Sequence, residues 1–319
     1  MQLAANAGLT TIVLSAVWKS GASATNDLPP LRRAVRAAKA EGIEPQLAIY
    51  QLSSSTPLDD AARTAFSDYA VALVQALPSV RTVFVGNEPN LNLFWMPQFD
   101  ASGGDAAAAS YEQLLATTYD ALKRADPKIT VAGANLAPRG GDDPSASRQT
   151  HSPTAFIKDL GSAYRASGRT KPLMDVFSIH VYGESPKIGP SFRHPRTTSI
   201  GIGDYDKLVT LLGQAFDGTA QPGSKLPIIY GEYGVETSVP DDGYTGTEVV
   251  PAVDPGTQAR YYREAIELTA CQKNVRALDF FHVIDERRLA GLQSGLYYLD
   301  GSAKPSAAAV KKTPLTCGS

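Results

Sequence analysis

Short apolar runs alternate along the chain with longer segments in which apolar residues recur every three or four positions. The short runs are rich in β-branched and aromatic residues and end near Gly, Pro or Asn, which predicts buried β-strands. Strands are expected at Thr10–Trp18, Glu44–Gln51, Val80–Asn87, Ile129–Leu136, Asp175–Tyr182, Leu226–Glu232 and Ala277–Ile284. Strict alternation of strands and helices indicates a parallel sheet with helical crossovers, either doubly wound or closed into a barrel.

The segments between these runs have the apolar spacing of amphipathic helices. In the first example the repeating apolar positions are Phe66, Tyr69, Leu73 and Leu77. In the second they are Tyr111, Leu115, Thr118 and Leu122. Because proline cannot continue a helix, Pro78 and Pro127 are expected to end these two helices just before the next strand.

Seven strands are one fewer than a (β/α)8 barrel needs. Residues Met1–Gly8 have the pattern of the helix that should follow a first strand, and Lys304–Lys312 that of a closing helix. The length of 319 residues suits one barrel. We therefore expect a single α/β domain over residues 1–319, a (β/α)8 TIM barrel whose first strand is missing or irregular in this chain.

Loop lengths support a functional rim. The connections that leave four of the expected strands are long: Pro89–Asp105, Ala137–Ser152, Gly183–Gly203 and Glu236–Asp254. In a parallel barrel all of them lie at the carboxyl ends of the strands, where such enzymes keep their active sites. The alternative is that they are tolerated surface insertions.

Two glutamates carry the candidate chemistry. Glu88 and Glu232 each follow an apolar run, so each is expected at the carboxyl end of a buried parallel strand. Two such carboxylates are the minimal equipment for cleaving a glycosidic bond, one as proton donor and one as nucleophile. Taken singly, the first could instead cap a loop and the second could form a structural ion pair.

Three motifs resemble those of the clan A glycoside hydrolases, which are retaining (β/α)8-barrel enzymes. They are Gly86-Asn87-Glu88-Pro89, Gly231-Glu232 and Ser178-Ile179-His180-Val181-Tyr182. Counted from a missing first strand, the two glutamate motifs follow the fourth and seventh strands, as in that clan. The resemblance spans nearly the whole chain and implies that Glu88 is the acid/base and Glu232 the nucleophile.

The resemblance also suggests substrate contacts. Asn87 would hydrogen-bond the sugar 2-hydroxyl, although it could equally be a turn residue. His180 and Tyr182 lie two apart on one strand and so share a face. Tyr182 could orient Glu232, and His180 could bind a hydroxyl or be a buried, satisfied histidine.

Further candidates are less specific. The two tryptophans, Trp18 and Trp95, could stack on a sugar ring or simply pack in the core. Many clan A enzymes have a tryptophan on the last strand, and this chain departs from that pattern. The residues there that could replace it or reach a hydroxyl are Phe281, His282, Asp285 and Glu286.

The composition of the chain limits the classes of binding partner that are expected. The chain is 43% hydrophobic and 19% charged with a net charge of −2, so it has no basic excess for binding nucleic acid. No apolar stretch approaches the ~20 residues that span a bilayer, and Met1–Gly8 lack the pattern of a signal peptide. A disulfide between Cys271 and Cys317 would indicate secretion, and two unpaired thiols are the alternative.

Other site classes are poorly supported. The four histidines show no metal-ligand spacing, no Gly-x-Ser-x-Gly elbow is present, and no cofactor is implied. The sequence therefore predicts a retaining glycoside hydrolase acting on a β-glycoside or the equivalent α-L-arabinoside. The alternatives are a catalytically impaired carbohydrate-binding barrel, and a barrel lyase or isomerase that uses the same glutamates.

Overall fold

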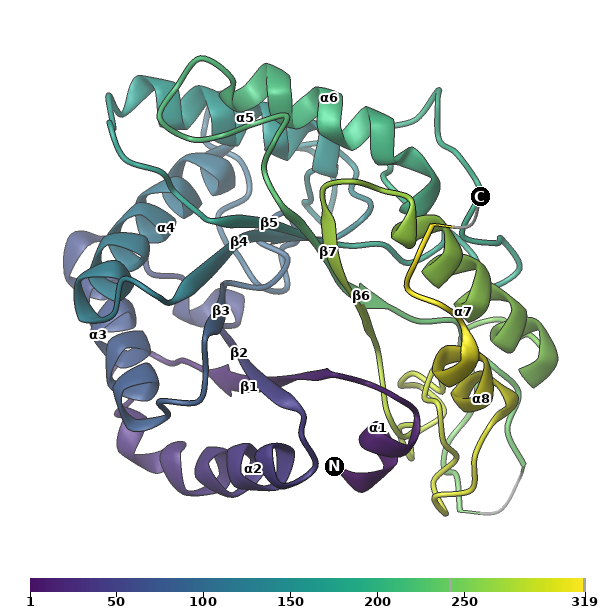
Figure 1. Ribbon diagram of the computed structural model, residues 1–319. Coiled ribbons are helices and arrows are strands. Elements are labelled where there is room, and N and C mark those ends of the chain that lie inside the picture. The colour runs from purple at the N-terminus through teal and green to yellow at the C-terminus, as the bar shows by residue number, and fades with distance from the viewer. Residues whose placement is uncertain (241–242, 318–319) are drawn as a thin grey trace.

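The computed structural model describes residues 1–240 and 243–317 and contains a curved sheet of seven parallel strands (Figure 1). The strands are β1 (Thr11–Val17), β2 (Glu44–Tyr50), β3 (Thr82–Val85), β4 (Thr130–Leu136), β5 (Val176–His180), β6 (Ile228–Tyr233) and β7 (Val275–Phe280). Neighbours in the sheet are neighbours in the sequence, from β1 to β7. This is a TIM-barrel-like half-barrel that lacks one strand, as expected.

Helices cover the outer face of the sheet. They are α1 (Gln2–Asn6), α2 (Leu28–Ala40), α3 (Asp60–Ala76), α4 (Ala106–Ala125), α5 (Pro153–Ala166), α6 (Tyr205–Phe216), α7 (Pro255–Ala270) and α8 (Pro305–Lys312). In Figure 1, α2 to α7 run around the outside of the strands. Both helices predicted from apolar spacing are confirmed, and α3 and α4 end just before Pro78 and Pro127.

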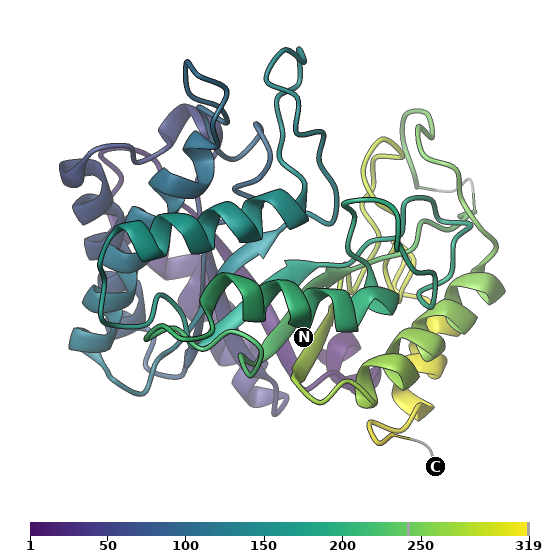
Figure 2. The same cartoon turned by 90° about the horizontal axis from the view of Figure 1, so that it is seen from above.

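Two of the long rim loops end in an aspartate whose side chain caps the next helix. Asp105 accepts a hydrogen bond from the backbone of Ala108 at 2.7 Å, and Asp254 does the same for Thr257 at 2.9 Å. Such N-caps contribute about 1 kcal/mol each. Because all strands are parallel, the loops after β3, β4, β5 and β6 leave from the same rim, and Figure 2 shows them along one side of the molecule.

The last strand differs from its predicted position. It was expected at Ala277–Ile284 but lies at Val275–Phe280. The chain leaves the sheet after Phe280, and Ile284 forms a bridge with Tyr297 instead. The apolar run continues past the strand because the following segment packs on the C-terminal part of the chain, so apolar content alone placed the strand end too late.

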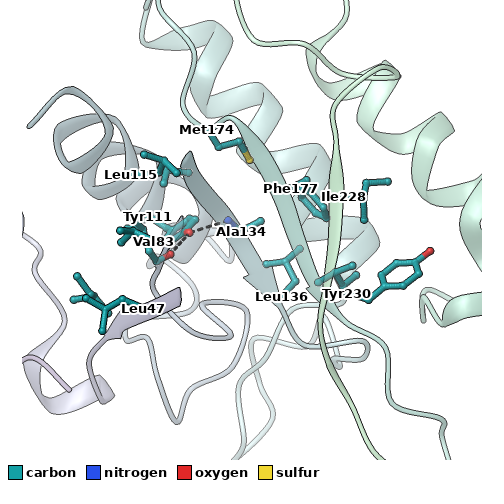
Figure 3. Close-up of a cluster of buried hydrophobic side chains, with 14 of the residues drawn as sticks. Leu47, Val83, Tyr111, Leu115, Ala134, Leu136, Met174, Phe177, Ile228 and Tyr230 are labelled. Carbon is teal, nitrogen blue, oxygen red and sulfur yellow. Dashed lines mark hydrogen bonds between the residues drawn. The ribbon is translucent and has the colours of Figure 1, made fainter. Parts of the chain in front are cut away.

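Apolar side chains alternate between the two faces of the sheet. The helix-facing core includes Leu47, Val83, Phe177, Ile228 and Tyr230, which pack with helix residues such as Tyr111 and Leu115 (Figure 3). The inner face has its own layer, to which every strand contributes: Val13, Ala48, Tyr50, Phe84, Ala132, Val176, Ile229 and Ala277. Burial of each large apolar side chain stabilises the fold by about 1.5–3 kcal/mol.

The two ends of the sheet are not joined. β1 and β7 are its edges, and they do not pair with each other. Near the second edge, Cys271 at the end of α7 forms a disulfide with Cys317, as predicted. The bridge closes a segment of 46 residues, which corresponds to about 4 kcal/mol in the chain-entropy description.

Candidate active site

Glu88 stands on a sharp turn after β3. Gly86 has φ +81°, and a Cβ there would lie 2.9 Å from a ring carbon of Tyr111. Glu88 itself has φ +40°, in the left-handed region that non-glycine residues rarely adopt. Its backbone N–H donates to the carbonyl of Asn135 at 2.9 Å, so the end of β4 holds this turn.

Glu232 lies within β6, where it pairs with His180 of β5. The residue before it is Gly231, and a Cβ there would lie 2.7 Å from Ser178 Oγ and 3.0 Å from Asn135 Oδ1. Glycine is therefore needed because polar side chains of β4 and β5 fill the space beside it. The Tyr182 hydroxyl donates to Glu232 Oε2 at 2.8 Å, which fixes the carboxylate.

A single imidazole nitrogen links the two carboxylates. His180 Nδ1 lies 2.8 Å from Glu88 Oε1 and 3.4 Å from Glu232 Oε2. The two oxygens cannot be farther apart than the sum of these distances, 6.2 Å. Retaining glycosidases hold their carboxyl groups ~5–5.5 Å apart and inverting ones ~6.5–9.5 Å apart. The facing oxygens of this pair are thus at most 6.2 Å apart, which is compatible with the retaining arrangement.

The charges of the three groups are interdependent. Burial raises the pKa of Glu232, the His180 imidazole opposes this, Glu88 raises it further, and the Tyr182 hydrogen bond lowers it. Burial alone would lower the pKa of His180, but the carboxylates of Glu232 and Glu88 together raise it above its ordinary value. His180 thus gains a proton more readily than a free histidine, and its charge favours ionised carboxylates.

Asn87 belongs to a polar cluster that sequence reasoning did not identify. Its Oδ1 accepts a hydrogen bond from Asn135 Nδ2 at 3.2 Å, and Asn135 Oδ1 accepts one from Ser178 Oγ at 2.8 Å. Signals for both residues were present. Asn135 is a polar residue near the end of an apolar run, and Ser178 lies two positions before His180 on the same strand face.

The tryptophans do not present a stacking surface. Trp18 is 1% exposed and packs edge-on against Phe66, with ring centroids 5.5 Å apart. Trp95 is fully buried against Tyr111, and its indole N–H donates to Ser110 Oγ at 2.9 Å. Of the two alternatives, packing in the core is the one observed for both residues, and sugar stacking is not, because the core encloses the rings.

The polar candidates after the last strand have their contacts with groups other than the carboxylate pair. His282 Nε2 is 3.8 Å from Glu286 Oε1, and among the described residues no hydrogen bond or ion pair joins either to Glu88 or Glu232. Asp285 instead forms a buried ion pair with Lys304 at 2.7 Å.

Phe281, in the same segment, lies near the site, with its ring centroid 6.3 Å from that of Tyr182.

A cavity of about 300 Å³ lies beside the site, under the loop after β5. Tyr182, Arg139, Glu184 and Phe192 are among its lining residues, whereas the two catalytic candidates are not. Burial lowers the pKa of Arg139, and the carboxylates of Glu184 and Glu88 oppose this. The guanidinium therefore lies in the electrostatic field of Glu88.

In the described part of the chain, no three or more His, Cys, Asp or Glu side chains are grouped so as to hold a metal ion. None of the described helices is long and apolar enough to cross a membrane.

Comparison with solved structures gives matches over nearly the whole chain. A family 39 glycoside hydrolase from the gut symbiont Bacteroides cellulosilyticus has a TM-score of 0.67 at 18% identity, covering 98% of this chain and 60% of that one. A family 39 β-xylosidase from Caulobacter crescentus has a TM-score of 0.54 at 20% identity, covering 88% and 56%. A broad-specificity family 5 endoglucanase from Clostridium longisporum has a TM-score of 0.61 at 13% identity, covering 98% and 84%.

The chain thus spans 60% and 56% of the lengths of the two family 39 enzymes. No protein-family model matches the sequence, and no curated protein matches it. At these identities the similarity establishes the fold. Over nearly its whole length, the chain has the parallel barrel-like fold of its structural neighbours, the clan A glycoside hydrolases, with one strand missing.

Proposed function

We propose that this protein is a retaining glycoside hydrolase in which Glu232 is the nucleophile and Glu88 the acid/base. The observation that carries the proposal is the contact of both carboxylates with one nitrogen of His180, at 2.8 Å and 3.4 Å. This separation suits double displacement, in which one carboxyl group attacks the sugar and the other transfers protons. The barrel-like fold, shared with glycoside hydrolases, makes a carbohydrate the natural ligand of this rim.

In the first step, a carboxylate oxygen of Glu232 attacks the anomeric carbon. The bond from that carbon to the leaving oxygen breaks, and the proton of the Glu88 carboxyl group passes to the leaving oxygen. The products are a glycosyl ester on Glu232, a free alcohol and an ionised Glu88. Burial raises the pKa of Glu232, so its reactive form depends on the opposing effects of His180 and Tyr182.

In the second step, Glu88 removes a proton from water while the water oxygen attacks the anomeric carbon. The ester bond to Glu232 breaks, and the released sugar has the configuration of the substrate because the carbon is inverted twice. His180 contacts both carboxylates, so its imidazole can interact with whichever of them is ionised at each step. Asn87, next to Glu88, would hydrogen-bond the sugar 2-hydroxyl, and Phe281 beside Tyr182 would offer an aromatic surface.

A β-glycoside is the proposed substrate class. Two of the structural neighbours are named as a β-xylosidase and an endoglucanase, and clan A enzymes resembling this chain mostly act on equatorial glycosidic bonds. The disulfide between Cys271 and Cys317 supports an exported enzyme, because such bonds persist in oxidising compartments.

A carbohydrate-binding barrel without turnover is the second candidate. Two observations favour it: the sheet lacks one strand, and burial raises the pKa of Glu232, which disfavours the ionised nucleophile. In this case the protein would bind a sugar, and Glu232→Gln would leave the affinity unchanged.

The test is a panel of aryl β-D- and α-L-glycosides assayed with wild type and Glu232→Ala, with azide added to the variant. We expect turnover by wild type, its loss in the variant, and rescue by azide as a glycosyl azide of inverted configuration. That product identifies Glu232 as the nucleophile because azide occupies the space of the missing carboxylate.

Glu267→Ala is the matched control, since Glu267 lies on α7 and pairs with Arg263 at 3.9 Å, outside the site. Equal loss in both variants, or an active Glu232→Ala without azide, would overturn the assignment. If wild type turns over no substrate of the panel but binds a sugar directly, the result would favour the binding barrel.

A further inference from the structure

The amide of Asn135 lies between the two strands that carry the catalytic machinery. Ser178 Oγ of β5 donates to Asn135 Oδ1 at 2.8 Å. Asn135 Nδ2 donates in turn to the carbonyl of Gly86 at 3.1 Å and to Asn87 Oδ1 at 3.2 Å. Ser178 is fully buried and Asn135 is 4% exposed, so water does not compete strongly for these bonds.

The direction of each bond in this chain is determined. A backbone carbonyl can only accept, so the Asn135 atom that faces Gly86 must be the nitrogen. Asn135 Oδ1 then faces Ser178, whose hydroxyl supplies the proton. Because Asn135 donates to Asn87, the facing atom of Asn87 is its oxygen. The Asn87 Nδ2 group is thereby oriented away from this contact, and no hydrogen bond within the described residues uses it.

The backbone of Asn135 acts on the same turn. Its carbonyl accepts the N–H of Glu88 at 2.9 Å, and its own φ is +50°. The neighbouring Ala134 N–H donates to the Tyr111 hydroxyl at 2.9 Å, which donates to the carbonyl of Val85 at 2.6 Å (Figure 3). The ends of β3 and β4 are therefore joined by side-chain and backbone bonds at the place where the chain turns into Glu88.

We propose that Asn135 is a positioning residue that sets how Asn87 presents its amide to the substrate, with Ser178 setting the orientation of Asn135. The inference rests on the proposed glycosidase function. We call the chain of hydrogen bonds from Ser178 through Asn135 to Asn87 the relay. Through it Asn87 offers an N–H donor, so the sugar must supply an acceptor there, which is the oxygen of its 2-hydroxyl group. The relay thus favours sugars that carry an oxygen acceptor at position 2 over their 2-deoxy analogues.

The readout is the ratio of kcat/KM for an aryl β-glycoside to kcat/KM for its 2-deoxy analogue. Asn87→Ala should lower this ratio by about tenfold, the effect of one lost hydrogen bond. Asn135→Gly removes the orienting amide while tolerating the positive φ, and should lower the ratio to a similar extent. In the double variant the ratio should fall no further, because both changes remove the same contact.

Two more variants separate orientation from packing. Asn135→Asp keeps the shape but replaces the Nδ2 donor with an oxygen, so the ratio should fall as in Asn135→Gly. Ser178→Ala should give a smaller decrease in the ratio. Ser67→Ala is the control, because Ser67 is also a buried hydroxyl, 3.0 Å from Thr118 Oγ1 between α3 and α4, and it should leave the ratio unchanged.

If Asn135→Gly lowers kcat/KM equally for both substrates, Asn135 has only a structural role and the proposal is wrong. A crystal structure of Asn135→Gly tests the relay without turnover. We expect the Asn87 side chain to leave its wild-type position, and an unchanged Asn87 amide would overturn the relay. Absence of wild-type activity, by contrast, would count against the glycosidase function, while the crystal structure would still decide on the relay.

Discussion

The two candidate catalytic glutamates are held in different ways. Glu88 is placed by its backbone, which turns at positive φ and donates its N–H to Asn135. Glu232 lies in a strand and is placed by its side chain, whose Oε2 contacts Tyr182 at 2.8 Å and His180 at 3.4 Å. Only His180 contacts both carboxylates among the hydrogen bonds and ion pairs of the described residues.

This difference suits the two proposed roles. An acid/base must gain and lose a proton in each cycle, and backbone positioning keeps its geometry in both states. A nucleophile must stay ionised, and donors to its carboxylate stabilise the charged form against burial. The comparison suggests that the positions of the two carboxyl groups depend on different residues, which can be altered separately.

The largest expected effect distinguishes the two roles by leaving group. Glu88→Ala should lower kcat/KM by about 10³-fold for alkyl or sugar leaving groups, which need protonation, and far less for acidic phenols. Glu232→Ala should abolish turnover of both kinds of substrate, because the attacking oxygen is gone. The measurement is kcat/KM across a series of aryl glycosides of decreasing phenol pKa. Equal losses for all leaving groups in Glu88→Ala would remove the acid/base assignment.

A smaller effect tests the side-chain support of Glu232. Tyr182→Phe removes one hydrogen bond to a charged acceptor and should lower kcat/KM by about 10–100-fold. Because this bond lowers the pKa of Glu232, its loss should move the acid limb of the pH profile to higher pH.

Tyr244→Phe is the matched control for Tyr182→Phe. Tyr244 also donates to a carboxylate, Asp285 Oδ2 at 2.8 Å, but in a different part of the molecule. A Tyr182→Phe profile that keeps its acid limb would show that this hydroxyl does not control the ionisation of Glu232.

The smallest effect concerns Asp279, a carboxyl on β7 that lies in the field of Glu232. Burial and, to a smaller extent, the carboxylate of Glu232 raise the pKa of Asp279 to about 7, against the opposing effect of His180. The folded protein therefore keeps this proton up to about pH 7, whereas the unfolded chain releases it near 3.8. The associated stability is present at low pH and is lost as pH rises between these values.

Asp279→Asn cannot ionise, so its free energy of unfolding should exceed that of wild type by about 1–2 kcal/mol at about pH 8. At about pH 4 the two proteins should differ little, since wild type is then protonated as well. Urea titrations at both pH values give the comparison. A wild-type advantage at the higher pH would mean that Asp279 is ionised and well solvated.

Most of the fold was predictable because its signals are local. Apolar runs and helical spacing identified all seven strands of the described sheet and showed that a barrel would lack one strand. The two cysteines suggested the disulfide that they form. The exception was the end of β7, where Ile284 pairs outside the sheet. An apolar residue indicates burial but does not say against what it is buried, so such errors arise where the chain leaves one layer for another.

The candidate site was predictable in part. Motif order placed Glu88, Glu232, His180 and Tyr182 on one rim, and the structure brings these four together. It left open whether Trp18 and Trp95 face solvent, and both are buried. Whether an aromatic residue is enclosed depends on helices that pack on it from distant parts of the sequence, which spacing does not reveal.

The sequence by itself determined the order of strands and helices and the approximate place of each, because these depend on neighbours along the chain. The tertiary structure decided how Glu88, Asn135, Ser178 and Glu232 meet across four strands. It also decided that one imidazole spans the carboxylates and that a glycine leaves room for the polar relay. These are contacts between distant residues, set by strand register and by the left-handed turn at Glu88 rather than by any local pattern.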